Sequence, residues 1–332
     1  MLLKNIAIFV PPKNGPLPPP GDRPIVRATE RLLNEQIQCI FGHQFRRTDT
    51  SLLMDGLSAS GQQWIEHSDV EIHAVYDRFP SQLRRQSFQP MLKAILPSPM
   101  GNPYPYTLLC RDKIKTQHWL ESNGIRMPEL VTQHDQFEAK LAQWGTGFIK
   151  PQFGALGTSV EKVYAGGPLP RHLPGLVPDE PEPTILQRTI HPPKGYAGMS
   201  VRCLIQRQNN TQWICRTPVL RHSTKDPVVN VARGAAACAA KDLLPEQCMQ
   251  DITHTAMHIG KLINALECGQ FALECGIDFV IDSEYTPWIV ELNSRPRGRL
   301  EYLAKAKPDH YEEEHIEALA QPIRCLATLA SG

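Results

Sequence analysis

The prolines of this sequence limit its fold more than any other feature. They number 30 of 332 residues, and most lie in three stretches, 11–24, 97–105 and 168–193. Proline lacks the backbone N–H and has a fixed φ, so a proline cluster is incompatible with a helix interior or a central strand. We therefore expect loops or unit boundaries at these three places. The stretch 168–183 fits either a mobile lid or an ordered surface loop.

The segments between these stretches carry the periodicity of helices and strands. Before residue 108, apolar runs predict strands at 4–10 and 71–76 and helices at 28–41 and 83–96, an alternation typical of a small α/β unit. Helical spacing follows at 111–123, closed by Gly124, and at 136–143. Residues 147–151 and 160–163 are expected to form a hairpin with a glycine-rich tip. Further strands are predicted at 184–190, 200–207, 212–220, 271–281 and 287–292, with a helix at 245–266.

The last two predicted strands carry acidic and amide side chains. Side chains alternate between the two faces of a strand, so Glu291 and Asn293 project to the same side, and antiparallel pairing brings Asp278 beside them. Two carboxylates and an amide oxygen form a hard-oxygen cluster suited to Mg²⁺. The alternative is an exposed strand face with unrelated acids. The apolar neighbours Ile289 and Leu292 disfavour it, because an unpaired carboxylate on a buried strand is costly.

The predicted hairpin tip is a second candidate site. Glycines at 154 and 157 let the backbone approach an anion, and the hydroxyls of Thr158 and Ser159 can donate to phosphate oxygens, with Lys150 as a point charge. The alternative is an ordinary turn. The spacing matches neither a Walker A loop nor the G-x-G-x-x-G fingerprint of a dinucleotide fold.

These motifs, in this order, resemble the ATP-grasp superfamily from about Arg111 to the C-terminus. The resemblance rests on Arg111-Asp-Lys113 opening a helix, Phe148-Ile-Lys150-Pro before the glycine loop, Ile185-Leu-Gln187 as a hinge strand, and Asp278 with Glu291-Leu-Asn293. Within the superfamily, the chain is similar to the YheC/YheD-type, spore-coat-associated group. That similarity rests on Val75-Tyr-Asp-Arg-Phe-Pro-Ser81, Asn102-Pro, Cys110-Arg-Asp-Lys113 and Glu291-Leu-Asn-Ser-Arg-Pro296.

The resemblance implies an α/β protein with the ATP-grasp fold and an N-terminal α/β pre-ATP-grasp domain. The expected domains are 1–108 for the N-terminal domain, 109–186 for the small lobe with the glycine-rich loop, and 187–332 for the large lobe with the magnesium-binding strands. ATP would lie between the two lobes.

The resemblance also assigns roles to single residues. Lys113 and Lys150, with Gly154, Gly157, Thr158 and Ser159, would bind phosphates, and Gln187 would contact adenine. Asp278, Glu291 and Asn293 would hold one or two Mg²⁺ ions. Arg221, Asn230 and Arg202 would face the reacting phosphate, although the usual paired glycines after the asparagine appear only as Arg233-Gly234-Ala235. From the residues themselves, Arg295, Arg297 and Arg299, which alternate after the metal strand, are expected to bind a substrate carboxylate, and a solvated basic face is the alternative.

The function implied by this set is an ATP- and Mg²⁺-dependent carboxylate–amine ligase that forms an amide bond through an acyl phosphate. Its partners would be small molecules, an amino acid or short peptide with a carboxylate and an amine. Two alternatives stay open: kinase-like phosphoryl transfer to a small molecule, and a non-catalytic nucleotide-binding structural or assembly protein. The sequence names neither the substrates nor the pathway.

Composition and charge exclude several other classes. The formal net charge is +1, which argues against a nucleic-acid binder, and the longest apolar runs fall short of the ~20 residues that cross a bilayer. With no leader pattern and nine cysteines that form no C-x-x-C pair, a cytoplasmic protein with reduced thiols is expected. His254 and His258 share a helix face, which we expect to be a polar surface rather than a metal site. Exposed edges of the first domain would allow a homodimer.

Overall fold

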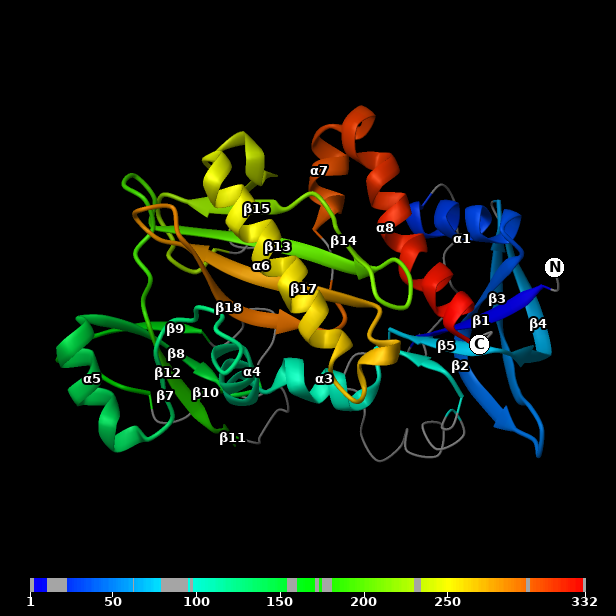
Figure 1. The fold of residues 1–332 in the computed structure, drawn as a ribbon, viewed down its shortest axis with the longest axis horizontal. Helices are drawn as coiled ribbons and strands as arrows, with labels where there is room; N and C mark the ends of the chain where they lie inside the picture. Colours follow the sequence, from blue (N-terminus) through cyan, green and yellow to red (C-terminus); the bar gives the residue numbers. More distant parts are fainter. Residues whose placement is uncertain are drawn as a thin grey trace.

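The computed structural model describes residues 3–10, 23–61, 63–78, 95, 98–153, 160–170, 173–174, 181–229, 234–296 and 299–330. In these residues the strands form three larger sheets and one short pair (Figure 1). The strands of the N-terminal and second sheets, with the short pair, are β1 (Lys4–Phe9), β2 (Ile37–Arg47), β3 (Leu52–Ser60), β4 (Gln63–Ile72), β5 (Ala74–Asp77), β6 (Met100–Gly101), β7 (Leu130–Val131), β8 (Thr146–Pro151), β9 (Glu161–Tyr164), β10 (Leu173–Pro174), β11 (Pro181–Glu182) and β12 (Thr184–Arg188).

The strands of the third sheet are β13 (Gly198–Arg207), β14 (Trp213–Cys215), β15 (Val219–Ser223), β16 (Ala236–Ala239), β17 (Glu274–Ile281) and β18 (Pro287–Asn293). The α-helices are α1 (Pro24–Asn34), α3 (Tyr104–Arg111), α4 (Lys113–Glu121), α5 (Phe137–Trp144), α6 (Glu246–Asn264), α7 (Leu300–Ala306) and α8 (Pro308–Leu329). No helix in these described ranges is long and apolar enough to cross a membrane.

The first sheet has the strand order β4-β3-β2-β1-β5-β6. Its β2, β1, β5 and β6 are parallel, and β3 and β4 extend it as an antiparallel meander. β1 is buried on both faces: Ile6 and Ile8 pack with helices α1 and α8, and Ala7 and Phe9 belong to the core on the opposite face. The C-terminal helix therefore returns to the N-terminal sheet (Figure 1).

Two predictions for this first unit were wrong. The helix expected over 28–41 ends at Asn34, and β2 begins at Ile37, because Gln36 takes a left-handed φ of 63° and turns the chain. The apolar residues from Ile37 onward then pair with β1 as a parallel strand instead of continuing the helix. The strand expected over 71–76 is two strands, β4 and β5. The helix expected over 83–96 lies outside the described residues except for Ile95.

The second sheet is small, with the order β7-β12-β8-β9. The predicted hairpin of β8 and β9 is confirmed, and its tip at 154–159 lies outside the described residues. On one face, Ile149 and Leu186 pack against Phe137 and Leu141 of helix α5. The opposite face carries Phe148, Lys150 and Gln187. Alternation along β8 and β12 thus separates a core side from a polar side.

The third sheet, β16-β15-β13-β17-β18 with β14 beside β13, carries α6 across one face (Figure 1). The residues of α6 at that face are apolar, as the i, i+3, i+4 spacing predicts, and include Ile252, Ala256, Ile259 and Ile263. The single strand expected over 212–220 was wrong. It divides into β14 and β15 at Pro218, which has no N–H to give to a strand ladder.

Helix α8 connects the first and third sheets. It packs on α1 and β1, and it also contacts β13, where Gln206 donates to the carbonyl of Ala318 at 2.7 Å and Gln321 donates to the carbonyl of Arg207 at 2.9 Å. The three larger sheets fall within residues 4–101, 130–188 and 198–293. The exact domain boundaries stay a prediction.

Candidate active site

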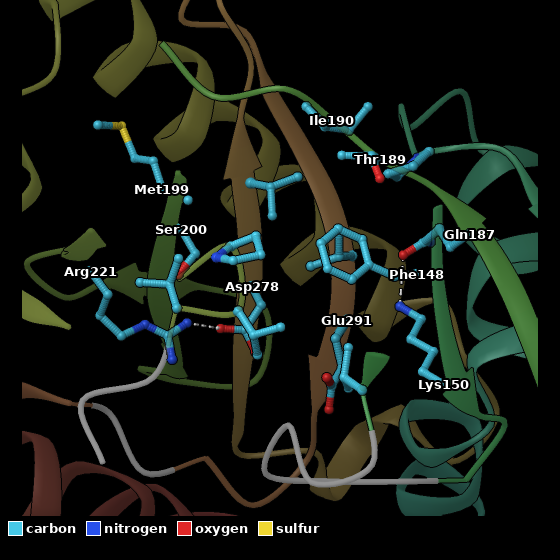
Figure 2. A pocket seen from close by; sticks show the side chains of 18 of the residues that line it. Phe148, Lys150, Gln187, Thr189, Ile190, Met199, Ser200, Arg221, Asp278 and Glu291 are labelled. Atoms are coloured by element: carbon cyan, nitrogen blue, oxygen red, sulfur yellow. Dashed lines mark hydrogen bonds and ion pairs between the residues drawn. The ribbon is translucent and has the colours of Figure 1, made fainter. Parts of the chain in front are cut away.

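A cavity of about 620 Å³ lies between the polar faces of the second and third sheets. Its wall includes strands β8 and β12, the hinge residues that follow β12, and strands β13, β15, β17 and β18. Figure 2 shows Arg221, Asp278, Glu291 and Lys150 in this order across it. Residues from distant parts of the chain therefore meet in one enclosed space.

Strand alternation explains why the third sheet is polar on the cavity side. In β13 and β17, Val201, Cys203, Cys275 and Ile277 point to the core beneath α6. Their neighbours in sequence point the other way. The cavity face therefore carries Ser200, Arg202, Arg221, Asp278, Glu291 and Asn293.

Asp278 is the most heavily hydrogen-bonded of these side chains. Arg202 donates from Nε to Oδ1 at 2.7 Å and from Nη2 to Oδ2 at 2.5 Å, and Arg221 donates from Nη2 to Oδ1 at 3.1 Å. Asn293 adds a bond from Nδ2 to Oδ2 at 3.1 Å. Burial by itself would raise the pKa of Asp278, but the charges of Arg202 and Arg221 outweigh burial and hold the pKa below its ordinary value.

Glu291 lies opposite Asp278 in the β17–β18 register, as the sequence predicted. Its carboxylate has no hydrogen bond or ion pair with any described residue, and it points into the cavity (Figure 2). Asn293, two residues further along the strand, borders the same cavity and also carries an amide oxygen. These two hard-oxygen donors fit Mg²⁺, which binds through one or two carboxylates together with substrate phosphates.

Asp278 fits a metal less directly, because its two oxygens already accept four hydrogen bonds. To bind Mg²⁺ it would have to share or give up one of its arginine contacts. No three His, Cys, Asp or Glu side chains in the described part of the chain are grouped closely enough to hold a metal ion by themselves. The protein side of the predicted metal site is thus Glu291 and Asn293, with Asp278 behind them.

Lys150 and Gln187 form the opposite wall. β8 and β12 pair antiparallel with Phe148 across from Gln187, so Lys150 lies one diagonal step away and donates to Oε1 of Gln187 at 2.7 Å. The pKa of Lys150 is lowered to about 7, mainly by burial and also by the nearby charge of Lys113, while Glu291 and Asp278 act in the opposite direction. A cation this poorly solvated is suited to an anionic ligand.

Lys113 also lines the cavity, 7% exposed, at the start of helix α4. The helix begins there because Asp112 is its N-cap and accepts from the backbone N–H groups of Ile114 and Lys115. Gln152, just after β8, donates to the same carboxylate at 2.9 Å. Asp112 therefore ties α4 to β8 and holds Lys113 near Lys150.

Two buried hydroxyls in the cavity wall have no hydrogen-bond partner among the described residues. They are Oγ1 of Thr189, in the hinge after β12, and Oγ of Ser200 on β13. Both residues are less than a tenth exposed. Buried hydroxyls normally have a partner, so each of these two is available to a polar ligand, Thr189 at the hinge and Ser200 beside Arg221. Sequence reasoning missed both, because nothing in their local pattern distinguishes them from packing residues.

Arg295 lines the cavity but is already paired. It donates from Nη2 to Oδ2 of Asp77 at 2.7 Å and from Nε to the Asp77 carbonyl at 3.0 Å. Nearby, Glu274 accepts from Tyr76 at 2.5 Å and from Arg78 at 3.0 Å. These contacts join the end of β5 in the first sheet to the third sheet. The predicted role of Arg295 in carboxylate binding stays a prediction, with Asp77 as its present partner.

The remaining predicted residues divide into two groups. Lys113, Lys150, Gln187, Arg202, Arg221, Asp278, Glu291, Asn293 and Arg295 all border the same cavity. Gly154, Gly157, Thr158, Ser159, Asn230 and Arg297 lie outside the described residues, so their predicted roles stay predictions.

His254 and His258 border a second cavity of about 420 Å³, with Asp251 on the same helix and Arg126 opposite. Their helix face is therefore part of a depression. As for the first cavity, the described His, Cys, Asp and Glu residues here form no group of three that could hold a metal ion.

The family comparison agrees with this arrangement. The model of the YheC/D-like ATP-grasp family matches residues 179–321. The resemblance predicted from the motifs is thus confirmed. The matched region runs from the end of the small sheet through β12, the third sheet and most of α8, and it contains Gln187, Asp278, Glu291 and Asn293. No curated protein sequence matches the chain.

Solved structures show that the fold extends over the whole chain. The D-alanine–D-alanine ligase from Coxiella burnetii matches with a TM-score of 0.57 at 12% identity, over 100% of this chain and 96% of that one. The D-alanine–D-alanine ligase from Bacillus anthracis, complexed with ATP, matches with a TM-score of 0.56 at 12% identity, over 100% and 99%. Carboxyaminoimidazole ribonucleotide synthase from Aspergillus clavatus, also complexed with ATP, gives 0.58 at 11% identity, over 98% and 77%. The chain has the ATP-grasp fold, as predicted.

Proposed function

We propose that this protein is an ATP- and Mg²⁺-dependent ligase that joins a carboxylate to an amine. One observation carries the proposal. Two buried lysines, an unpaired carboxylate and two arginines face one another across a single cavity between two sheets. The ATP-grasp fold and the ligases among its structural neighbours support the same reading.

We assign each residue a role from its position in the cavity. Lys113 and Lys150 offset the charge of the triphosphate, and Thr189 and Gln187 contact the base at the hinge. Glu291 and Asn293 hold Mg²⁺, which neutralises charge on the transferred phosphoryl group. The substrate carboxylate attacks the γ-phosphorus, the bond to the β-phosphate oxygen breaks and ADP leaves, and Arg221 and Arg202 stabilise the acyl phosphate that forms. An amine then displaces phosphate and gives the amide.

Positioning and electrostatics suffice for this chemistry, so it needs no nucleophilic serine or cysteine. The third sheet supplies rigid support, because each of its functional side chains stands on a strand whose other face is core. The arginines at Asp278 are held in place by that carboxylate, so their guanidinium groups are oriented before a substrate arrives.

The test is phosphate release from Mg²⁺-ATP, screened against pooled amino acids, dipeptides and small carboxylates, with mass spectrometry of the active pools. A product with the mass of acid plus amine minus water establishes the ligase. A stable phosphorylated product with no amine incorporated indicates a kinase instead. ATP binding with no stimulated turnover in any pool supports a nucleotide-binding structural role. Absence of ATP binding contradicts the proposal altogether.

A further inference from the structure

The arginine side of the cavity holds more positive charge than the proposed reaction requires. We propose that the acid substrate carries a second anionic group, a carboxylate or a phosphate, and that Arg299 binds it together with Arg221. This inference rests on the ligase function proposed above and deepens it by naming the substrate class. Arg299 lies just before helix α7 and borders the same cavity.

The first support comes from the balance of charge. Among the described residues of the cavity wall, nine lysines or arginines face two carboxylates, Asp278 and Glu291. Most arginines near the third sheet already have an acid. Arg202 pairs with Asp278, Arg295 pairs with Asp77, and Arg78, outside the wall, pairs with Glu274.

Arg299 has no acidic partner in the described structure. Its guanidinium donates from Nη1 to the hydroxyl of Tyr302 at 3.3 Å and lies 5.8 Å from the centre of that ring. The charge of Arg299 also acts on Arg221 and on Asp278, lowering the pKa of each, although burial is the largest influence on both. Arg299 therefore lies close enough to Arg221 and Asp278 for its charge to act on both.

The second support is a pair of unsatisfied donors. The Nε atoms of Arg221 and Arg299 are both buried, and neither has a hydrogen-bond partner within the part of the chain that the structure describes. Arg221 is 8% exposed as a whole. Buried guanidinium N–H groups are seldom left without an acceptor, and an anion is the acceptor that guanidinium binds best. Two such donors in one wall define a receptor for an anion.

The backbone at Arg299 adds a third observation. Its φ of 66° is left-handed, a conformation that is unfavourable for a residue with a Cβ atom and that glycine adopts freely. Leu300 and Leu303, 1% and 3% exposed, anchor the helix that follows. An arginine kept in a position suited to glycine is consistent with a use for its side chain.

A second anionic group on the substrate accounts for the excess of positive charge in the cavity wall better than the reacting groups do. Lys113 and Lys150 stand on the opposite wall, where the triphosphate is placed, and Arg202 beside Asp278 is enough for the reacting carboxylate. Arg221 can then turn its Nε toward a second anion. Arg299 then remains for a charge elsewhere on the acid. A diacid or a phosphorylated acid supplies that charge, whereas a simple monoacid does not.

The test measures binding, so it does not depend on turnover. The full-length protein is saturated with Mg²⁺ and a non-hydrolysable ATP analogue. Acids that differ by the presence of a second anionic group are then titrated by calorimetry. The sets are glutamine with glutamate, and butanoate with butanedioate and 3-phosphonopropanoate. Variants are Arg299→Gly, which suits the left-handed backbone, and Arg299→Lys, which keeps the charge. Lys305→Met removes one exposed charge from the same helix as a control.

We expect at least one acid with a second anionic group to bind about tenfold more tightly than the acid of its set that has a single carboxylate. Arg299→Gly should abolish that preference, Arg299→Lys should restore part of it, and Lys305→Met should leave it intact. Within the second set, tighter binding of butanedioate indicates a site for a carboxylate, and tighter binding of 3-phosphonopropanoate indicates a site for a phosphate. The inference is overturned if no dianion is preferred in the wild type, or if the preference survives in Arg299→Gly. Failure of the ligase function would appear separately, in the phosphate-release assay.

Discussion

At the scale of single residues, Asp278 and Glu291 face each other across two strands but differ in their surroundings. Asp278 accepts four hydrogen bonds, three of them from arginines, and so holds Arg202 and Arg221 in place in the cavity wall. Glu291 accepts none from a described residue and points into the space. The register pairs the two residues, and the arginines decide which carboxylate remains available to a metal ion.

We expect Glu291→Gln to lower Mg²⁺-dependent turnover by about 100-fold or more, because it removes a carboxylate that has no partner among the described residues and that we assign to Mg²⁺. The free energy of unfolding should change by less than about 0.5 kcal/mol, since the side chain has no partner to lose. The measurement is phosphate release as a function of Mg²⁺ concentration. Glu284→Gln, in the exposed turn of the same hairpin, is the control. Full activity of Glu291→Gln would contradict the metal assignment.

Lys150 gives a prediction for pH dependence. Its pKa is about 7 without ligand, and a bound phosphate favours the charged ammonium, so ATP binding should take up a proton. Above pH 7 the free lysine is increasingly neutral, and the affinity for ATP should therefore fall, by up to about tenfold per pH unit. Calorimetry at pH 7 to 9, in buffers of different ionisation enthalpy, measures both the affinity and the proton uptake.

Lys150→Arg is the matched control for this experiment, because a guanidinium stays charged throughout that range. Its ATP affinity should change little between pH 7 and 9. If wild type and Lys150→Arg show the same pH profile, another group is responsible and the assignment of Lys150 to the phosphates loses its support.

At the scale of elements, alternate side chains of the third sheet point either to the apolar core or to the cavity. One face of β13 and β17 packs beneath α6, and the other faces the cavity. The side chain of Arg202 also needs space on the cavity face of β17. At Gly276 on β17, a Cβ atom would lie 2.6 Å from Cβ of Pro296 and 2.9 Å from Nη1 of Arg202. Glycine here allows Arg202 to lie flat against the strand and reach Asp278.

We expect Gly276→Ala to lower the free energy of unfolding by about 1–3 kcal/mol through overpacking. It should also lower turnover, because Arg202 is displaced from Asp278. Urea denaturation and phosphate release measure the two effects. Ser283→Ala, in the exposed turn between β17 and β18, should change neither. Unchanged activity in Gly276→Ala would show that the position of Arg202 is not critical.

At the scale of the whole molecule, α8 unites the parts of the fold. Its apolar side completes the core of the first sheet, where Ile323 and Leu326 are fully buried beside Ile6 and Leu32. Its other contacts reach β13 through Gln206 and Gln321. The polar network of Tyr76, Arg78 and Glu274 joins the same two sheets.

Because α8 belongs to both regions, we expect Ile323→Ala to destabilise them together. The cavity left by a buried isoleucine costs about 2–5 kcal/mol of unfolding free energy. Hydrogen exchange should show loss of protection in β1 and β13 alike, within a single transition in urea. Thr328→Ala, exposed near the end of the same helix, should stay within about 0.5 kcal/mol of wild type. Loss of protection confined to β1 would show that the sheets unfold independently.

Much of the candidate site could be read from local pattern. The period-2 alternation around Asp278, Glu291 and Asn293 and the hairpin of β8 and β9 were predicted correctly, because strand periodicity and short antiparallel pairing depend on residues close in sequence. The N-terminal meander was missed. There, a continuous apolar run fits a helix as well as a buried strand, and pairing with β1 decides between them.

The sequence by itself therefore determined most of the charged side chains that face the cavity and the order in which they occur along the chain. Only the tertiary structure decided their electrostatic states. Asp278 receives its arginines from 57 and 76 residues away, and Arg295 is bound to Asp77 across 218 residues. Burial makes each unpaired charge costly, so the folded chain pairs most of them over long distances. Within the described residues, neither Glu291 nor Arg299 has a partner of opposite charge, and these two carry the metal site and the anion site proposed here.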